Sequence, residues 1–484
     1  MLNGLLLVLA CAGGADDSGD PTGDGGGTGD GGATADGGTG DGGSGGDGGG
    51  GGDGGGTTSD GGGSDGGGTT EEPAPVSGLG WALDDDIGSI GVVSWTQDEA
   101  VDAAWVEFQV GDEGWRQGPT LGGEAGARSA LVLGVPYGSE VQVRVLNQVG
   151  AVEKASEVLV GATDPLPDGL VPPTASSPLA GSLDPGLVYS LLSLSTPSND
   201  VWKLIIDRQG RIVWAHESAG TTGSMQVSVD GSHIIWDERG VRADVHRMRL
   251  DGEIFQTVEL SGLHHSFTEA SGGALLWGGT DADGDEVVRE RAPDGTIREL
   301  FDCTEWWRSH GASIPCDGNA VTWLPEDDTL YFSSDNETTV VHLDRATGQV
   351  LATYGTLDGS WAFAKGSSRF FKQHSPKRTP EGNLIVSSHL TISDRTMVTR
   401  EYRLDAKTET LTEVWTCDPG SGIPADHGGE TWRLDGGNTL LNYGPGAAIR
   451  EYTPECELAW ELAWPAGTSL RRMTVLGDLY PLVE

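Results

Sequence analysis

Apolar and polar residues alternate along much of the chain after residue 75, with the period of two that half-buried strands show. Four early segments carry this alternation between Gly- and Asp-rich turns: 91–95, 104–110, 129–134 and 140–146. No helical period is present. Short strands separated by such turns over about 90 residues are typical of a sandwich. We therefore expect a small β-sandwich over 76–165, with Trp95 in its core.

Two short patterns alternate from about residue 185 onward, and they indicate a repeat architecture. The first is a polar turn followed by an apolar strand, at 228–236, 269–277, 324–332, 379–388 and 434–444. The second is a turn and a strand that often ends in Trp, at 207–214, 250–258, 293–300, 344–355, 405–415 and 454–462. Copies spaced by about 40 to 60 residues are the signature of β-propeller blades. We predict an all-β chain with a six-bladed β-propeller over 166–484, in which most Trp side chains are core.

The first 75 residues have a different composition from the rest of the chain. Residues 12–75 are almost wholly Gly, Asp, Ser and Thr, so they cannot bury apolar surface and are predicted to be a disordered linker. The apolar run before them is too short to span a bilayer, and Val8-Leu9-Ala10-Cys11 resembles the lipobox of bacterial lipoproteins. We expect residues 1–11 to be a lipoprotein-type signal peptide with Cys11 as the lipidation site. The alternative is an uncleaved apolar end, because no Lys or Arg precedes the run.

The charge of the chain excludes one class of partner. The formal net charge is −44, and the first 75 residues hold 13 acidic residues and no Lys or Arg, which leaves −31 for 76–484. Such a field repels nucleic acid and anionic lipid. We expect no nucleic-acid partner, and contact with a membrane only through a lipid anchor at Cys11.

The four cysteines outside the N-terminal segment predict two disulfides, and they are Cys303, Cys316, Cys417 and Cys456. Two disulfides fit an oxidising compartment, but four cysteines allow three connectivities. The rival is a zinc site, which is weak because no CxxC spacing occurs. We expect an exported protein on the bacterial cell envelope, at the periplasmic face or the cell surface, with no metal and no cofactor.

The histidines gather in the predicted propeller. All ten lie between His216 and His427. His264, His265, His374 and His427 each come just before one copy of the turn-strand pattern. Equivalent positions in successive blades converge on the propeller axis, so we expect these imidazoles to face one channel.

Five blocks, in order between about 190 and 475, resemble the bacterial aryl-sulfate sulfotransferase family. They are HHSFTEASGGALLW (264–277), CDGNAVTWLPEDDTLYFSSDNETTVVHLDRATGQV (316–350), FKQHSPKRTPEGNLIV (371–386), ETWRLDGGNTLLNYG (430–444) and IREYTPECELAWEL (449–462). In addition, LVLGVPYGSEVQVRVLNQVGA (131–151) resembles the second half of a fibronectin type III domain. The resemblance implies a fibronectin type III-like sandwich, read as a spacer, before an arylsulfotransferase-like propeller.

The arylsulfotransferase resemblance implies a chemistry and a site. In that family a channel histidine attacks the sulfur of an aryl sulfate, becomes sulfo-histidine, and passes the sulfuryl group to a phenol without a nucleotide donor. By position, His374 matches the nucleophile and His265 a supporting histidine that binds or protonates the substrate. Asn319 matches the asparagine of the family's H-x-N motif, and His264 and His427 are further candidates for substrate binding.

Two positions depart from the family pattern. Asp317 stands where the family has a histidine, and Asp335 where it has an arginine. A sulfate beside two carboxylates is disfavoured unless those carboxylates are protonated or paired. Five residues are candidates to supply positive charge that compensates these carboxylates: Arg308, His310, Lys372, Lys377 and Arg378. The departures leave open a non-catalytic propeller used for ligand binding or adhesion, and hydrolase or lyase chemistry on another anionic aryl or glycan substrate.

DADGDE at 281–286 has alternating acidic residues but lacks the Gly and the distal Glu of an EF-hand loop. We expect a hairpin turn there, with calcium binding as the alternative.

Overall fold

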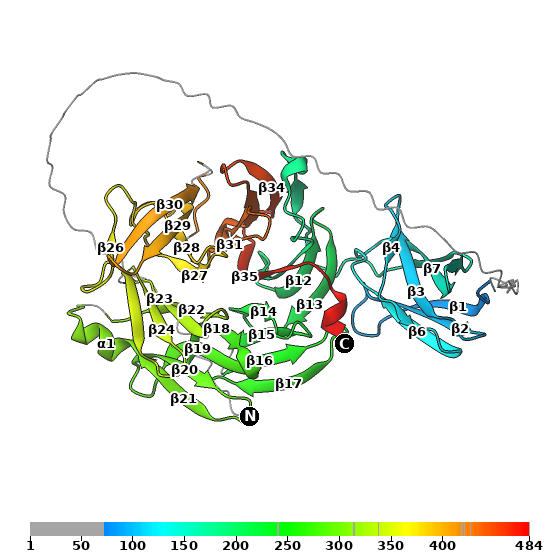
Figure 1. Cartoon of the computed structure of the whole chain (residues 1–484), viewed down its shortest axis with the longest axis horizontal. Coiled ribbons are helices and arrows are strands. Elements are labelled where there is room, and N and C mark those ends of the chain that lie inside the picture. Colours follow the sequence, from blue (N-terminus) through cyan, green and yellow to red (C-terminus); the bar gives the residue numbers. More distant parts are fainter. Residues whose placement is uncertain are drawn as a thin grey trace, which may run out of the picture. The chain divides into compact units, whose positions relative to one another are not determined.

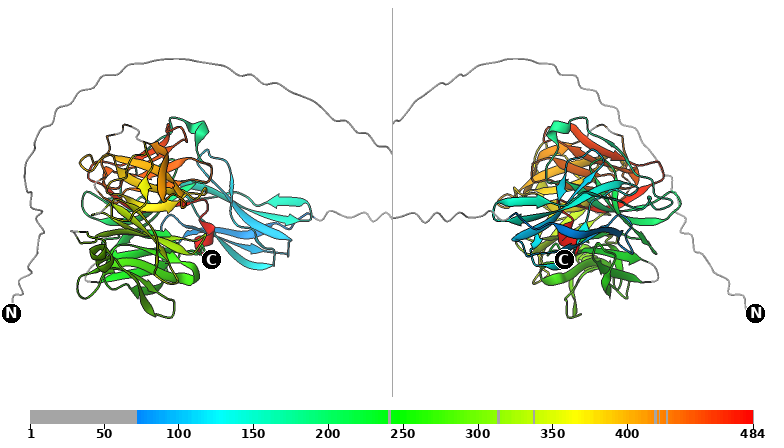
Figure 2. Two further views of the ribbon diagram at one scale, coloured as in Figure 1. Left: turned by 60° about the vertical axis from the view of Figure 1, so that its left-hand side comes forward. Right: turned by 90° about the vertical axis from the view of Figure 1, so that its right-hand side faces the viewer.

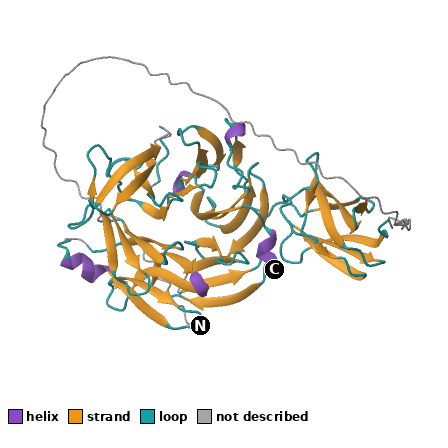
Figure 3. Ribbon diagram, viewed as in Figure 1, coloured by secondary structure: helices purple, strands orange, loops and turns teal. Residues whose placement is uncertain are grey.

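The computed structural model describes residues 72–483, except 240, 241, 313, 314, 337, 418, 419, 421 and 426. Strands make up nearly all of its regular structure (Figure 3), which confirms the predicted all-β class. The predicted signal peptide 1–11, the lipidation site Cys11 and nearly all of the linker 12–75 lie outside the described residues. Those assignments stay predictions.

The first part of the described chain forms two antiparallel sheets. One sheet has the order β1-β2-β6 and consists of β1 (Val76–Leu83), β2 (Gly91–Gln97) and β6 (Gly126–Val132). The other is built on the order β4-β3-β7-β8 and consists of β3 (Ala103–Val110), β4 (Arg116–Gln117), β5 (Leu121–Gly122), β7 (Glu140–Val149), β8 (Val152–Ala155) and β9 (Leu159–Ala162). The four strands expected before residue 150 are present as β2, β3, β6 and β7.

One apolar cluster lies between these two sheets. In β2 the alternation works as predicted, since Val93 and Trp95 are buried while Ser94 and Thr96 are exposed. Trp95 is only 2 % exposed and shares the cluster with Phe108 of the second sheet. The period-two pattern therefore does place one face of each strand in a common core.

Six sheets follow, antiparallel except for the parallel pair of β26 and β30, and in most of them consecutive strands are neighbours. In spatial order, sheet 1 consists of β35 (Ser469–Leu476), β11 (Tyr189–Ser195), β12 (Val201–Asp207) and β13 (Ile212–Ser218). Sheet 2 consists of β14 (Met225–Val227), β15 (Ile234–Arg239), β16 (Ala243–Met248) and β17 (Ile254–Glu259). Sheet 3 consists of β18 (Leu263–Ala270), β19 (Ala274–Thr280), β20 (Glu286–Arg291) and β21 (Ile297–Asp302). Sheet 4 consists of β22 (Gly318–Leu324), β23 (Thr329–Ser334), β24 (Thr339–Asp344) and β25 (Val350–Gly355). Sheet 5 consists of β27 (His374–Arg378), β28 (Leu384–His389), β29 (Met397–Asp405), β30 (Thr410–Cys417) and β26 (Ala362–Phe363). Sheet 6 consists of β31 (Glu430–Arg433), β32 (Thr439–Asn442), β33 (Ala448–Tyr452), β34 (Leu458–Ala463) and β10 (Thr174–Ser176). This serial arrangement is propeller-like (Figure 1).

The two sequence patterns correspond to fixed places in these sheets. The six copies of the second pattern give the fourth strand of every sheet, namely β13, β17, β21, β25, β30 and β34. The five copies of the first pattern give the second strand of sheets 2 to 6, namely β15, β19, β23, β28 and β32. Sheet 1 has no copy of the first pattern, because no hairpin turn connects its first strand, β35, to its second strand, β11.

Sheet 1 is instead assembled from both ends of this part of the chain. The C-terminal strand β35 pairs with β11 in antiparallel register, for example Met473 with Leu192 and Leu470 with Leu194. In Figure 1 the red strand β35 is drawn near β12 of this sheet, and Figure 2 gives two further views of the same fold. The closure therefore brings the last strand of the chain into the first sheet.

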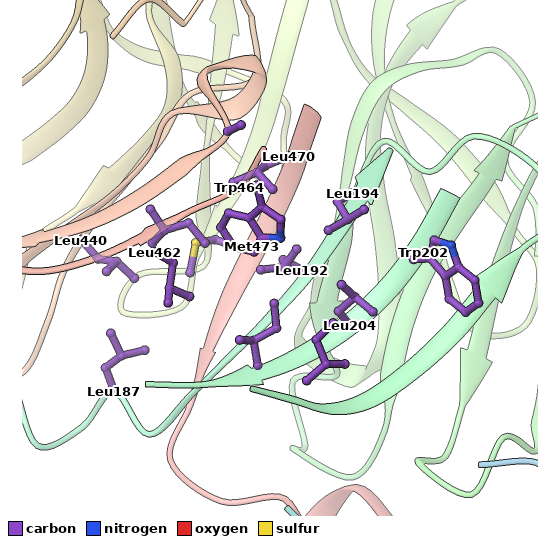
Figure 4. Packing of buried hydrophobic residues seen from close by; sticks show 14 of the residues in the cluster. Leu187, Leu192, Leu194, Trp202, Leu204, Leu440, Leu462, Trp464, Leu470 and Met473 are labelled. Atoms are coloured by element: carbon purple, nitrogen blue, oxygen red, sulfur yellow. The ribbon is translucent and has the colours of Figure 1, made fainter. Parts of the chain in front are cut away.

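Apolar faces of neighbouring sheets stack on one another. The cluster between sheets 1 and 6 joins Leu192 and Leu204 to Leu440 and Leu462 (Figure 4). Burying one such side chain contributes about 1.5–3 kcal/mol. The predicted core role of the repeated Trp residues also holds, since four of them are at most 1 % exposed: Trp214, Trp236, Trp277 and Trp460.

The cysteines pair as neighbours, Cys303 with Cys316 and Cys417 with Cys456, with Cα–Cα distances of 6.0 and 5.5 Å. The second disulfide links β30 of sheet 5 to the turn between β33 and β34 of sheet 6. Closing loops of these lengths contributes about 3 to 4 kcal/mol in the chain-entropy account. Two disulfides place the folded chain in an oxidising, extracytoplasmic compartment.

The sequence shows no helical period, yet the structure contains one short α-helix. α1 (Cys303–Ser309) begins after Asp302, whose side chain accepts a hydrogen bond from the N–H of Glu305 at 2.7 Å. At seven residues it is too short to show an apolar period, so it depends on this cap and on the disulfide at its first residue. The remaining helical turns are 3₁₀: η1 (Ala180–Ser182), η2 (Ser271–Gly273), η3 (Gly444–Gly446) and η4 (Tyr480–Val483). None of the helices in the described part of the chain is long and apolar enough to cross a bilayer.

DADGDE forms the turn between β19 and β20, as predicted from its composition. A carboxylate oxygen of Asp281 accepts hydrogen bonds from the N–H groups of Asp283 and Asp285, both at 2.9 Å. Asp285 also pairs with Arg308 at 2.9 Å. These bonds account for the acidic residues as an Asp-stabilised hairpin.

Candidate functional site

The first strands of the six sheets surround a small cavity. Each strand contributes at least one residue to its wall: Met225 of β14, Phe267 of β18, Val321 of β22, Lys377 of β27, Trp432 of β31 and Arg472 of β35. Its volume is about 170 Å³. Since all six sheets meet here, this cavity marks the axis on which the predicted site residues were expected to converge.

Arg472 ties four sheets together beside this cavity. Its guanidinium donates to the backbone oxygen of Asn319 at 2.9 Å, to the hydroxyl of Ser375 at 2.7 Å, and to a carboxylate oxygen of Glu430 at 3.1 Å. Ser375 donates to the same Glu430 oxygen at 2.9 Å, and the other oxygen accepts from the N–H of Met473 at 2.8 Å. Glu430 is buried, so this charge is stable there only because it is paired and fully hydrogen-bonded.

The segment around His374 is held rigidly at the start of β27. Gln373 is completely buried, and its side-chain amide donates to the hydroxyl of Ser333 and to the backbone oxygens of Ser334 and Thr339, all within 3.0 Å. The backbone oxygen of Gln373 in turn accepts from the side-chain N–H of Asn319 at 2.7 Å. Asn319 therefore positions the His374 segment through this bond, and its role in substrate binding stays a prediction.

The backbone on both sides of His374 is strained. Lys372 has φ of 48° and Ser375 has φ of 50°, a left-handed conformation that costs about 1 kcal/mol or more for non-glycine residues. The register of β27 against β28 also shifts between His374 and Lys377. Such strain persists where the surrounding contacts enforce it, and here it directs one imidazole out of the regular strand.

The His374 imidazole is oriented and neutral. Its Nδ1 lies 3.1 Å from the backbone oxygen of Lys372, so Nδ1 carries the proton and Nε2 keeps its lone pair. Burial lowers the pKa of His374 to about 4, Asp335 opposes this shift, and Arg472 adds to it. At neutral pH the side chain is an uncharged imidazole with a fixed tautomer.

Asp335, one of the two departures from the family pattern, is paired. Its carboxylate accepts a hydrogen bond from the ammonium of Lys372 at 2.6 Å. The other compensating candidates have different contacts: Arg308 with Asp285, Arg378 with Asp327, Lys377 over the ring of Trp432, and His310 against Trp306. Lys372, two residues before His374, is thus the candidate that neutralises the carboxylate at position 335.

A second group of side chains lies at the beginnings of β18, β20 and β22. The rings of His264 and His265 are 4.1 Å apart between centroids. His265 Nε2 lies 3.9 Å from a carboxylate oxygen of Asp317, and His264 Nδ1 lies 3.6 Å from a carboxylate oxygen of Glu286. Arg239 donates to the backbone oxygens of both histidines, which fixes the segment that carries them.

The two imidazoles of this group differ in their ionisation. The Glu286 carboxylate, 3.6 Å from His264 Nδ1, raises the pKa of His264. Desolvation, followed by the nearby His264, Arg239, Arg472 and His374, lowers the pKa of His265. His265 is therefore neutral at physiological pH, and its role of binding or protonating the substrate stays a prediction.

His374, His265, Asn319, Asp317 and Asp335 do come together in the structure, although they come from three sheets. His427 lies in the loop before β31 with an exposed side chain, and its role as a substrate contact stays a prediction. Sequence reasoning missed four further residues that complete the site: Arg239, Glu286, Glu430 and Arg472. Glu286 ends DADGDE and Glu430 begins one of the five blocks, but neither pattern assigned them a role at the axis, and Arg239 and Arg472 stand outside every quoted motif.

A larger cavity of about 440 Å³ lies between sheets 2 and 3 around His233, Arg247 and Glu269. The predicted site residues line neither this cavity nor the axial one, but Ser375, which follows His374, lines the axial cavity. Arg247 and Glu269 pair there at 2.5 Å, so the buried charges already satisfy each other. We place the candidate site at the axis, where the unusual backbone and the histidines coincide.

Fold and site together define a propeller-like β protein with an axial group of imidazoles, carboxylates and cations. No protein-family model matches the chain, and no curated protein matches it either. Among solved structures, the chain is similar to a structural-genomics protein of unknown function from Bacteroides thetaiotaomicron (10 % identity, 81 % of this chain and 99 % of that chain covered, TM-score 0.34). It is also similar to a gluconolactonase from Xanthomonas campestris (14 % identity, 61 % of this chain and 96 % of that chain covered, TM-score 0.32). A third similar structure is a luciferin-regenerating enzyme (8 % identity, 62 % of this chain and 100 % of that chain covered, TM-score 0.34). Likeness at this level does not carry a functional argument.

The role of Arg472 gives a stability prediction. Arg472→Met leaves Glu430 buried with its main cation removed, so we expect the free energy of unfolding to fall by about 3–5 kcal/mol. Adding Glu430→Gln to this variant removes the uncompensated charge and restores part of the loss. Thermal and urea unfolding of the full chain measure both effects.

Arg242→Met is the matched control, since Arg242 and Glu259 form an exposed pair with side chains 70 % and 48 % accessible. That substitution changes stability by at most about 1 kcal/mol. Equal losses for Arg472→Met and Arg242→Met would show that the contacts of Arg472 do not hold the sheets together.

Proposed function

We propose that this chain is an arylsulfotransferase-like enzyme that moves a sulfuryl group from an aryl sulfate to a phenol through His374. The observation that carries the proposal is the state of that side chain. It is a neutral imidazole with Nδ1 bound to a backbone oxygen, and it is set between two residues of positive φ. An oriented lone pair at Nε2 is what nucleophilic attack by histidine needs.

The proposed reaction has two balanced steps. His374 Nε2 donates its lone pair to the sulfur, an N–S bond forms, and the S–O ester bond breaks as the phenolate leaves with the bonding electrons. The acceptor phenol then attacks the sulfur through its oxygen, the N–S bond breaks, and Nε2 regains its lone pair. The proton lost by the acceptor phenol balances the proton gained by the departing phenolate, so no cofactor is consumed.

The charges around His374 support binding of a sulfate monoester. Arg472 is close enough to His374 to influence its pKa. Lys372 stands two positions before His374 and holds the ring through its backbone oxygen. Asp335, which weighs against an anion on sequence grounds, is paired with Lys372. Preorganised cations of this kind stabilise charge on a transferring group.

The rest of the chain fits a display arrangement in this proposal. We read the six sheets as six propeller blades and the two-sheet domain as a fibronectin type III-like spacer. Ile87, Ile90 and Leu133 of that domain pack with Trp214 and Leu479 of the propeller, which gives the spacer a firm attachment. A lipid at Cys11 and the acidic linker would then hold the propeller on the envelope.

One observation favours a second function, binding of a ligand without chemistry. Asp317 is not paired with Lys or Arg in the described part of the chain, and it faces His265. A carboxylate at that place disfavours a sulfate and is compatible with a cationic or hydroxyl-bearing ligand. A surface-displayed binding or adhesion propeller is the alternative on this ground.

A turnover assay tests the enzymatic proposal. The full chain is given p-nitrophenyl sulfate with and without a phenol acceptor, and release of p-nitrophenol is followed. We expect release that depends on the acceptor, and a loss of at least about a thousandfold in His374→Ala. His246→Ala is the matched control, because the His246 imidazole on β16 hydrogen-bonds to the hydroxyl of Thr257 and has no part in the proposed reaction. No release from a range of aryl sulfates would exclude the enzyme and favour the binding function.

The ionisation of His374 predicts the acid side of the pH profile. Protonation removes the lone pair on Nε2, and the pKa is about 4 in the presence of Asp335, Arg472, His389 and His265. We therefore expect the acidic limb of kcat/KM to have its midpoint near pH 4, whereas an ordinary histidine would give about 6.5.

The same shift lowers the stability of the fold in acid. Between about pH 6.5 and about pH 4 the unfolded state takes up a proton at His374 that the folded state does not, so the free energy of unfolding falls there. Circular dichroism at each pH separates this loss from a loss of activity. An acidic limb centred at 6.5 in a fully folded protein would contradict the assignment.

A further inference from the structure

His264, His265 and Asp317 meet in a way that the sulfuryl-transfer proposal does not use. One side-chain atom of each lies within 4.8 Å of the corresponding atoms of the other two. Asp317 is separated from the histidines by about 50 positions, so no spacing motif marks the group and the sequence predicts no metal. Two imidazoles and a carboxylate are nevertheless a donor set that zinc and other first-row metals bind.

We propose that His264, His265 and Asp317 bind a divalent first-row transition metal, zinc foremost, and that Glu286 orients His264 for this role. The metal site does not rest on sulfuryl transfer and stands if that reaction is absent.

The distances suit ligands that close around an ion. Zinc bonds of about 2.0–2.2 Å in a tetrahedron place ligand atoms about 3.3 Å apart. His265 Nε2 and the Asp317 carboxylate are already 3.9 Å apart. The three side chains are 44 %, 47 % and 40 % accessible, so each can rotate the short distance that remains.

Glu286 provides an independent observation. It is only 4 % exposed at the start of β20, and one of its carboxylate oxygens faces His264 Nδ1 at 3.6 Å. The other oxygen is buried and has no hydrogen-bond partner in the described part of the chain. This oxygen lies against Gly318 and next to Gly278. A Cβ at position 318 would come within 2.6 Å of the oxygen, so only glycine leaves room for it there. A buried carboxylate behind a metal-binding histidine is the usual arrangement that fixes the ring and its tautomer.

The balance of charge also favours a cation at this place. Asp335 is paired with Lys372, and Glu430 with Arg472. Among the residues that the structure describes, Asp317 and Glu286 pair only with the two histidines. Two carboxylates facing two imidazoles leave two negative charges, which one divalent ion neutralises.

Three protein ligands leave positions on the ion open to solvent or to a ligand, as catalytic rather than structural zinc sites do. His265 and His374 are near enough to influence each other's ionisation, so the ion would be close to the proposed nucleophile. There it would act as a Lewis acid toward an anionic or oxygen-bearing ligand, and it would supply the positive charge that Asp317 removes from the family pattern.

Direct metal binding tests the site. The full chain, stripped with a chelator, is dialysed against Zn²⁺ in excess Mg²⁺, so that carboxylates of the N-terminal segment are occupied. We expect one zinc per chain, and a loss of at least tenfold in affinity for His264→Ala and for Asp317→Asn. Co²⁺ in place of zinc should give visible absorption bands that both variants alter. Glu286→Gln should keep the bands and weaken binding by about 10- to 100-fold, since it acts through His264.

His246→Ala is the matched control and should bind zinc as the unaltered chain does. Circular dichroism and the two disulfides confirm that each variant is folded. Zinc bound equally well by the unaltered chain, His264→Ala and Asp317→Asn would overturn the proposal, as would the absence of stoichiometric binding. Zinc binding without p-nitrophenol release would keep the metal site and exclude the sulfotransferase, so the two proposals fail separately.

Discussion

The contacts of Arg472 are the constraint on which the axial site depends. This residue lies on β35, which reaches sheet 1 only because the end of the chain returns to pair with β11. From there one guanidinium contacts Asn319 of sheet 4, Ser375 of sheet 5 and Glu430 of sheet 6. The geometry of the site therefore depends on the closure of the fold, since the strand that closes sheet 1 also carries the Arg472 guanidinium.

Charge pairing decides what the site is able to hold. A carboxylate at position 335 argues against a sulfate on sequence grounds, but Lys372 neutralises it and at the same time holds the ring of His374 through its backbone oxygen. Asp317 has no such cation, and it shares its surroundings with His264, His265 and Glu286. The site thus has one part suited to an anion beside a neutral imidazole, and one part suited to a cation.

The repeats made the fold predictable, because a turn-strand pair must recur wherever a sheet is built from successive hairpins. They also led to the expectation that His264, His265, His374 and His427 face one axis, and in the structure the first three lie near one another. The contacts of Glu286 and Arg472 were beyond sequence reasoning, because they join residues that lie far apart in the chain. α1 escaped detection because its stability comes from a cap and a disulfide, and a seven-residue helix has no period to recognise.

The central claim is that the sulfuryl group passes through His374, and covalent trapping tests it most directly. The full chain is mixed with p-nitrophenyl sulfate without an acceptor, and its peptides are analysed by mass spectrometry at neutral to alkaline pH, to preserve an N–S bond. The account predicts one added sulfuryl group on the peptide that contains His374, lost when phenol is supplied. No added group, or the same group in His374→Ala, would contradict it.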